Sequence, residues 1–173
     1  MNANITIESN VLRTKEKIEL IVYSLISFFI PFLIANPQLL VGSIVNFFLA
    51  VTAIKFDLRY STPVIFLPSL GVFFAGLIFG VNTKYLIYFI PFIWIANFIF
   101  VYSFKLKINF FVKPLVASLL KAAFLFSVAM VMVYLFDFPK MFLLAMGLLQ
   151  LITALIGGYL AVVTIKIINK QVQ

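Results

Sequence analysis

No charged side chain occurs between Leu20 and Ala53. A single helix over this run would be about 50 Å long, whereas the hydrocarbon core of a bilayer is about 30 Å thick. The run must therefore turn, and Asn36-Pro37-Gln38 is the place, because proline lacks a backbone donor and disfavours helix at the preceding residue. Two membrane-spanning helices are predicted, over 18–35 and 37–54. The alternative is a re-entrant hairpin, although each arm alone is long enough to span.

Four further apolar runs follow, separated by short charged or glycine-containing segments. They predict helices over 63–79, 85–104 (bent at Pro91), 114–136 and 141–168. The composition agrees, since 65% of residues are hydrophobic and only 10% are charged, against about half and a quarter in soluble domains. The fold class is therefore all-α: a polytopic integral membrane protein with a bundle of six transmembrane helices over 18–168. Polar tails are predicted over 1–17, with a short amphipathic helix from Thr6, and over 169–173. The first tail lacks a signal-peptide cleavage pattern, so the first span is expected to remain as an anchor.

Lysine and arginine are distributed unevenly between the two sides of this arrangement. One side has only Lys84 and Lys140, and Lys121 lies inside the fifth predicted helix. The other side has Arg13, Lys15, Lys17, Lys55, Arg59, Lys105, Lys107, Lys113, Lys166 and Lys170. Because short loops rich in Lys and Arg stay cytoplasmic, the sequence predicts N-in/C-in topology in the cytoplasmic membrane. The lipid bilayer rather than nucleic acid thus accounts for the net charge of +8.

The sequence offers little for catalysis. It has no Cys or His, and its acidic residues lie in the first tail, at a helix end or in loops. Thiol chemistry, histidine metal sites, paired-carboxylate hydrolysis and intramembrane proton relays therefore lack their side chains. No GxxxxGK[ST] loop exists to bind ATP. We expect no enzyme activity, no catalytic residue, no metal site and no cofactor.

Three polar residues inside predicted helices stand out. Asn46, Asn97 and Lys121 each lie about 12–14 Å from the cytoplasmic end of their helix, which predicts one polar layer, with Gln150 nearer mid-membrane. Lys121 has two interpretations. It snorkels toward the cytoplasmic headgroups or pairs with Asn or Gln, or else it binds a ligand or partner. Interhelical hydrogen bonding is the simpler role for the amides.

The predicted outer turns carry a second group of polar residues. Asn36, Gln38, Asn82 and Lys84 lie there, with tyrosines nearby. A capture site for a small solute could be built from this rim. The alternative is an ordinary aromatic belt with interfacial polar residues.

Small residues form stripes on three predicted helices, which lets helices approach closely. These stripes serve packing within the chain or docking to another membrane subunit. The residues assigned to such helix packing are Gly71, Ala75, Gly76, Gly80, Ala154, Gly157, Gly158 and Ala161.

Three stretches carry a family resemblance. They are Asn36-Pro37-Gln38 followed by Val41-Gly42-x-x-Val45-Asn46, the segment 68–80 with its Phe-Gly turn, and the glycine-rich segment 147–158. The chain resembles the substrate-capture (S) components of energy-coupling factor transporters. The resemblance implies capture of a small, vitamin-like solute from outside, and release powered by a partner transmembrane scaffold with ATPases. It names no substrate. The site residues expected from the polar layer and the rim together are Asn36, Gln38, Asn46, Asn82, Lys84, Asn97, Lys121 and Gln150.

Two other functions are compatible with the sequence. A non-catalytic membrane scaffold, of the class illustrated by rod-shape-determining membrane proteins, would bind protein partners but no ligand. A self-contained channel would need a continuous polar path, and polar residues within the predicted spans are few.

Overall fold

The computed structural model describes residues 14–34, 37–76 and 82–171, and these residues are helical apart from short connections. The all-α prediction is confirmed. The elements are α1 (Thr14–Leu33), α2 (Gln38–Lys55), the 3-10 helix η1 (Leu58–Ser61), α3 (Thr62–Ala75), α4 (Thr83–Ser103), α5 (Lys113–Leu135), α6 (Met141–Met146) and α7 (Leu148–Gln171). The predicted helix from Thr6 lies outside the described residues.

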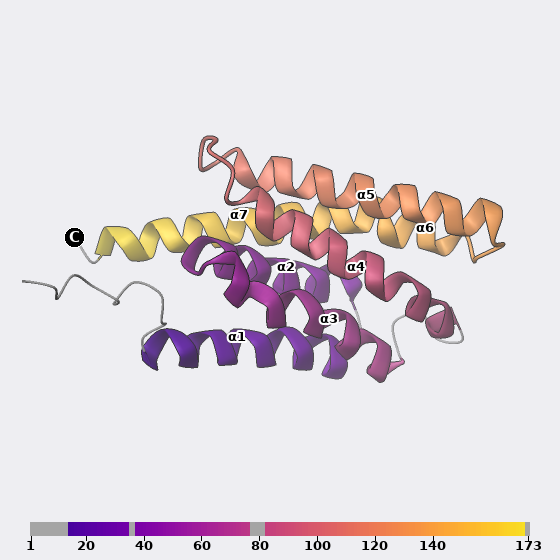
Figure 1. The fold of residues 1–173 in the computed structure, drawn as a ribbon, viewed down its shortest axis with the longest axis horizontal. Helices are drawn as coiled ribbons and strands as arrows, with labels where there is room; N and C mark the ends of the chain where they lie inside the picture. Colours follow the sequence, from indigo (N-terminus) through magenta and orange to yellow (C-terminus); the bar gives the residue numbers. More distant parts are fainter. Residues whose placement is uncertain (1–13, 35–36, 77–81, 172–173) are drawn as a thin grey trace, which may run out of the picture.

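Within the described residues, five segments are long and apolar enough to cross a membrane: 38–55, 58–75, 83–103, 113–135 and 141–170. The chain is therefore a multi-pass membrane protein by length and composition. Helix α1 has 20 residues, but charged residues occupy its first turns. It nevertheless lies lengthwise against the others, where it packs on α3 and α2 (Figure 1).

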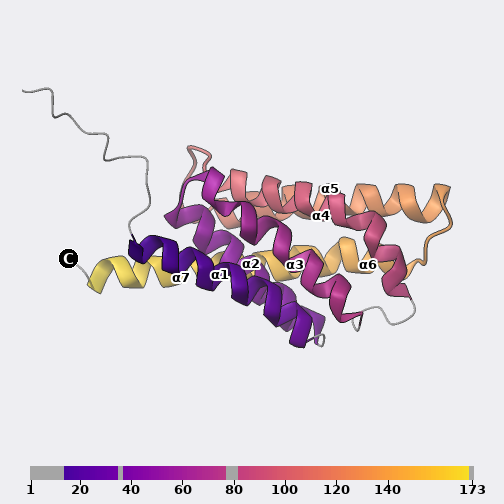
Figure 2. The same ribbon diagram turned by 60° about the horizontal axis from the view of Figure 1, so that its bottom comes forward.

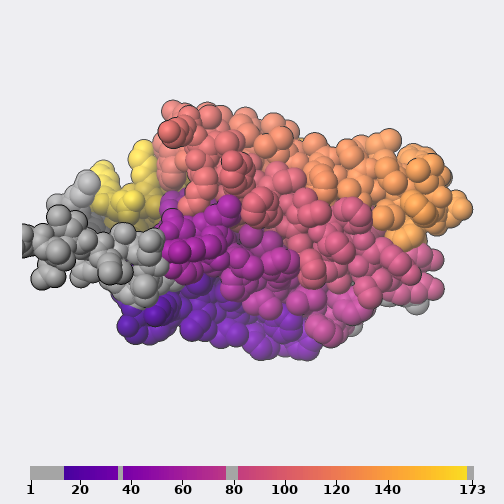
Figure 3. All heavy atoms as spheres, in the orientation of Figure 1, coloured from indigo at the N-terminus to yellow at the C-terminus, as the bar shows by residue number. Residues whose placement is uncertain are grey.

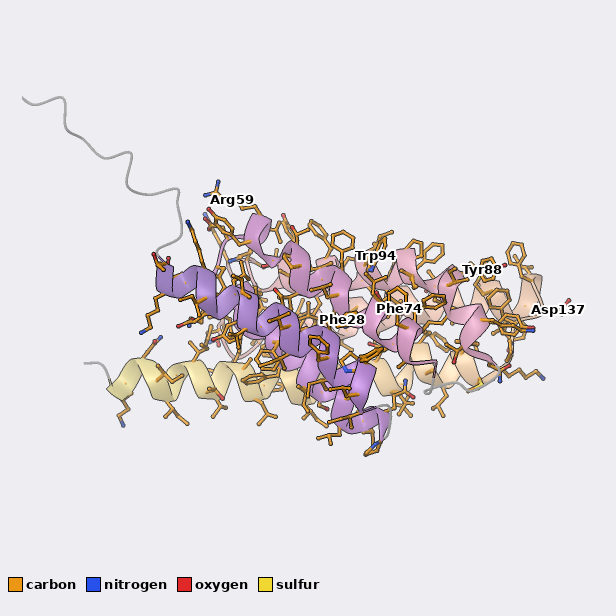
Figure 4. The ribbon with its side chains drawn as sticks, turned by 90° about the horizontal axis from the view of Figure 1, so that it is seen from below. Phe28, Arg59, Phe74, Tyr88, Trp94 and Asp137 are labelled. Carbon is orange, nitrogen blue, oxygen red and sulfur yellow. The ribbon has the colours of Figure 1, made fainter. Side chains whose placement is uncertain are left out.

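The helices form one elongated bundle whose two ends differ in charge. Helix α2 packs on α7, and α5 packs on both α4 and α7. The view in Figure 2 shows the same lengthwise arrangement from a second side, and Figure 3 shows α1, α3, α4 and α5 following one another across one face. Figure 4 places Arg59 and Asp137 at opposite ends of the long axis. We call these the basic end, which also carries Lys105 and Lys170, and the Asp137 end.

Several predicted helix boundaries are wrong, among them the start of the first helix, which is Thr14 rather than residue 18. Helix α3 ends at Ala75 rather than at residue 79, because Gly76 adopts a left-handed conformation with φ of 63° and its N–H bonds to the Val72 carbonyl. This is the common glycine termination of a helix. The predicted sixth helix is divided at Gly147 into α6 and α7. Pro91, where a bend was predicted, lies inside an uninterrupted α4.

Most of the small residues assigned to helix packing lie between helices of this chain. A Cβ at Gly157 would lie 2.5 Å from the Ser43 carbonyl oxygen of α2, and one at Gly71 would lie 2.4 Å from that of Phe28 in α1. A Cβ at Gly158 would lie 3.1 Å from the Pro114 side chain, and Ala154 and Ala161 are buried. Ala75 is half-buried and Gly76 exposed at the end of α3, while Gly80 lies outside the described residues. The stripe on α7 and Gly71 on α3 are thus used for packing within the chain, whereas Gly76 makes no such contact.

The apolar interior is divided into two clusters. One fills the basic end, with Leu49, Phe100 and Val162 among its members. The other fills the Asp137 end around Phe89 and Phe142, whose rings stack at 4.9 Å. Large apolar side chains are also exposed along the helices, as a lipid-facing surface requires. Polar side chains from the middle of the bundle lie between the clusters.

Candidate solute-binding cavity

Lys121 is the centre of the polar layer. It is only 2% exposed, and its Nζ donates to Asn46 Oδ1 at 2.6 Å and to Asn97 Oδ1 at 2.8 Å. Nζ also lies 5.3 Å from the centroid of the Phe100 ring. The structure thus brings the three predicted residues together from α5, α2 and α4. Of the two interpretations of Lys121 that involve no ligand, pairing with Asn is confirmed and snorkelling is wrong, because amide oxygens on two neighbouring helices hold its side chain inside the bundle.

The two asparagines are fixed by their other hydrogen bonds. Asn46 Nδ2 donates to the Gly42 carbonyl at 2.9 Å and to Thr153 Oγ1 at 3.2 Å. Asn97 Nδ2 donates to the Ile65 carbonyl at 2.9 Å. Because each amide has its donor group engaged elsewhere, each presents its oxygen to the lysine. The network joins α2, α3, α4, α5 and α7 at one level of the bundle.

Lys121 has no acidic partner within the described part of the chain. Glu19 pairs with Lys55 near the basic end, and Asp137 is exposed at the other end. An ammonium group has three donors, and the two amide oxygens occupy two of them. A buried charge is costly to leave without an opposite charge. The site therefore has one remaining donor and lacks one negative charge.

A cavity begins at this layer. It has a volume of about 90 Å³, and every one of the seven α-helices contributes to its lining. At roughly 15 Å³ for each water-sized group, it holds about six such groups. Its polar lining residues are Gln38, Asn46, Ser69, Asn97, Lys121, Gln150 and Thr153. The remaining wall is mainly aliphatic, with Val45, Val72, Ile93 and Leu149 among its members.

The cavity extends from the polar layer toward the Asp137 end. On α2 its lining runs from Gln38 to Asn46, and on α4 from Leu86 to Asn97, so it stops at the level of Lys121. On the other side of that level, Leu49 and Phe100 are 0% exposed within the basic-end cluster. The polar layer is therefore the floor of a blind cavity rather than part of a path through the bundle.

The other predicted site residues, which are the rim residues and Gln150, have different positions. Gln38 and Gln150 line the cavity. Asn82 Nδ2 instead lies 3.3 Å from Met141 Sδ, and Lys84 is exposed with its Nζ 5.4 Å from the Tyr85 ring centroid. Neither lines the cavity, because both precede its first lining residue on α4 and lie farther toward the bundle end. Asn36 is outside the described residues.

Two polar lining residues were missed as site residues, Thr153 and Ser69. Thr153 accepts from Asn46 and donates to the Leu149 carbonyl at 2.8 Å. The sequence could have indicated Thr153 as a site residue, since it follows Gln150 by one helical turn on the small-residue stripe. Ser69 accepts a hydrogen bond from Trp94 Nε1 at 2.8 Å, which tethers α4 to α3. Nothing in the sequence pattern distinguished it from other serines in apolar helices.

Comparison with known proteins adds no relative. No protein-family model matches the chain, and no curated protein and no solved structure matches it significantly. The function is therefore inferred from the cavity. Among the described residues, no group of three or more Cys, His, Asp and Glu side chains could hold a metal ion.

Proposed function

We propose that the chain is a substrate-binding membrane subunit resembling the S components of energy-coupling factor transporters. It captures a small solute in the cavity above Lys121. The single observation that carries this proposal is the blind cavity, with a polar floor built from three helices and aliphatic walls. A few convergent polar groups in a mainly apolar concavity are the usual composition of a small-molecule site.

The direction of capture follows from the charge distribution. If the Lys/Arg-rich end faces the cytoplasm, as the positive-inside rule indicates, the cavity extends toward the outside. The solute enters from the Asp137 end and stops at the Lys121 layer. The apolar cluster around Phe100 separates it from the cytoplasm. This arrangement fits capture from outside and argues against a self-contained channel.

Release requires a source of energy that the chain does not carry. The sequence lacks a phosphate-binding GxxxxGK[ST] loop, and the described residues that line the cavity include no carboxylate. A membrane scaffold with ATPases is therefore proposed as the partner that drives the opening toward the cytoplasm. The family resemblance predicts a vitamin-sized solute. The cavity in this conformation has room for only about six non-hydrogen atoms, so the solute proposed here is smaller.

A non-catalytic scaffold is the second candidate. The observation that favours it is the completeness of the Asn46 and Asn97 hydrogen bonds, which would equally serve to hold five helices in register. Under that function the cavity would contain only water, and the chain would bind membrane proteins without a ligand.

Native mass spectrometry separates the two functions. The protein is purified gently from its own membranes, together with a Val72→Phe variant that fills the cavity and a Val131→Phe control on the exposed face of α5. Solute capture predicts a small-molecule adduct in the wild type and the control but not in Val72→Phe. A clean apo mass in all three proteins, with a co-purifying membrane protein, would support the scaffold instead.

A further inference from the structure

The charge of the cavity floor indicates which class of solute it takes. We infer, on the basis of the proposed function, that the solute is a small organic monoanion whose carboxylate binds Lys121 Nζ. The ammonium already donates to Asn46 Oδ1 and Asn97 Oδ1, and its third donor remains for the cavity that Lys121 lines. A carboxylate there would complete the donor set and neutralise the buried charge.

The floor favours a single negative charge over a double one. Lys121 is the only charged side chain among the described residues that line the cavity. The donor groups of Asn46 and Asn97 are already directed to Gly42, Thr153 and Ile65. A phosphate dianion would bring a second charge and several acceptors that these groups could not satisfy. A carboxylate needs only the one strong donor that is available.

The walls determine the remainder of the solute. Above the floor lie Val45, Val72, Ile93 and Leu149, which favour a short aliphatic chain over further polar groups. The volume of about 90 Å³ allows about six non-hydrogen atoms, as in a four-carbon monocarboxylate. An inorganic monoanion such as chloride would satisfy Lys121 but would leave these walls without a partner.

Binding to the full-length protein in nanodiscs tests the inference with matched probes. Butyrate and butyramide have the same number of non-hydrogen atoms and differ in charge, and chloride supplies the charge without the chain. We expect butyrate to bind at least about tenfold more tightly than butyramide, because only the acid neutralises the buried ammonium. We expect the same preference over chloride, because chloride leaves the aliphatic walls without a partner. The preference for the acid should be lost in Lys121→Gln and retained in Lys140→Gln, whose site is exposed at the Asp137 end.

The wild-type comparison stands even if Lys121→Gln does not fold. Equal affinity for the acid and the amide, or a neutral adduct in the native mass spectrum, would overturn the inference and leave the proposed function in place. Chloride binding as tightly as butyrate would overturn the organic part of the inference. Binding of no probe, with no adduct on the purified protein, would overturn both the inference and the proposed function.

Discussion

Replacing Gly157 by alanine should destabilise the fold by separating α7 from α2. The added Cβ would lie 2.5 Å from the Ser43 carbonyl oxygen and 2.6 Å from the Phe47 nitrogen, and ordinary contact begins at 3.4 Å. The helices must therefore move apart by about 0.9 Å, the difference between 3.4 and 2.5 Å. Both obstructing atoms belong to the backbone, so no side-chain rotation relieves the contact.

That movement also affects the cavity floor. The hydrogen bond from Asn46 Nδ2 to Thr153 Oγ1 is already 3.2 Å long and crosses the same helix pair. A separation of 0.9 Å would lengthen it beyond 3.5 Å, where it no longer counts as a hydrogen bond. Overpacking costs about 1–3 kcal/mol, and an interhelical hydrogen bond in a membrane protein contributes about 0.6–1.7 kcal/mol. We expect a loss of about 2–4 kcal/mol in the free energy of unfolding.

Thermal unfolding in detergent measures this loss, with Gly158→Ala as the matched control. The two glycines are neighbours on α7, so the helix-propensity gain of up to about 1 kcal/mol is common to both substitutions. A Cβ at Gly158 would lie 3.1 Å from Pro114 Cβ and 3.6 Å from both Phe100 Cζ and Pro114 Cα, so no atom comes closer than 3.1 Å. Gly158→Ala should therefore stay near the wild-type melting temperature. A Gly157→Ala protein as stable as the control would refute the close packing of α7 on α2.

Three further predictions concern a helix end, the floor and pH. In Gly76→Ala the added Cβ would meet no atom within 4 Å, but the residue would have to keep a φ of 63°, which alanine disfavours. The substitution should therefore lower the free energy of unfolding by about 1–2 kcal/mol in the same unfolding assay, and Gly76→Asn should lower it by less. Asn97→Asp places a carboxylate beside Lys121 and should lower butyrate affinity by about tenfold or more; unchanged affinity in a folded variant would contradict the role of charge in binding. Burial, with a smaller contribution from nearby Lys113, lowers the pKa of Lys105 from 10.5. Since the folded state then loses this proton at lower pH than the unfolded state, the stability of the wild type relative to Lys105→Gln should rise as pH rises toward 10.5, and a fall would refute the assignment.

Much of the helical layout could be predicted from the sequence because charge and proline mark the turns. The predicted range 37–54 lies within one residue of α2 at each end, and 114–136 within one residue of α5. The end of α3 was missed because the apolar run continues to Phe79. An apolar run indicates which residues lie in the lipid, but it does not indicate where a glycine such as Gly76 adopts the left-handed conformation that ends a helix.

The common level of the three polar residues was predictable from their depth along the helices, but the pairing of Lys121 with the two asparagines was not. The rise per residue places Asn46, Asn97 and Lys121 at one level, and the structure joins them. Depth does not say which way a lysine points, so snorkelling toward the headgroups was an equally reasonable expectation. Pairing depends on the rotation of α2 and α4 about their axes, which tertiary packing determines.

The cavity itself could not be inferred from sequence. It exists because side chains from all seven α-helices fail to fill one volume, which is a property of packing rather than of any motif. The division of the last helix at Gly147 was hidden for a related reason. That glycine begins the glycine-rich segment 147–158, and composition does not show which glycine interrupts a helix and which one allows a close helix contact.

Labelling of introduced cysteines tests the central claim, a water-filled cavity reached from one side of the membrane, most directly. The chain contains no native cysteine, so Gln150→Cys in the cavity lining and Leu160→Cys on the exposed face of the same helix carry the only thiols. We expect a small, membrane-impermeant thiosulfonate added from outside to modify Gln150→Cys and to leave Leu160→Cys unmodified in lipid. Butyrate should slow the modification of Gln150→Cys. An unreactive Gln150→Cys, or equal reactivity at both positions, would contradict an accessible cavity above Lys121.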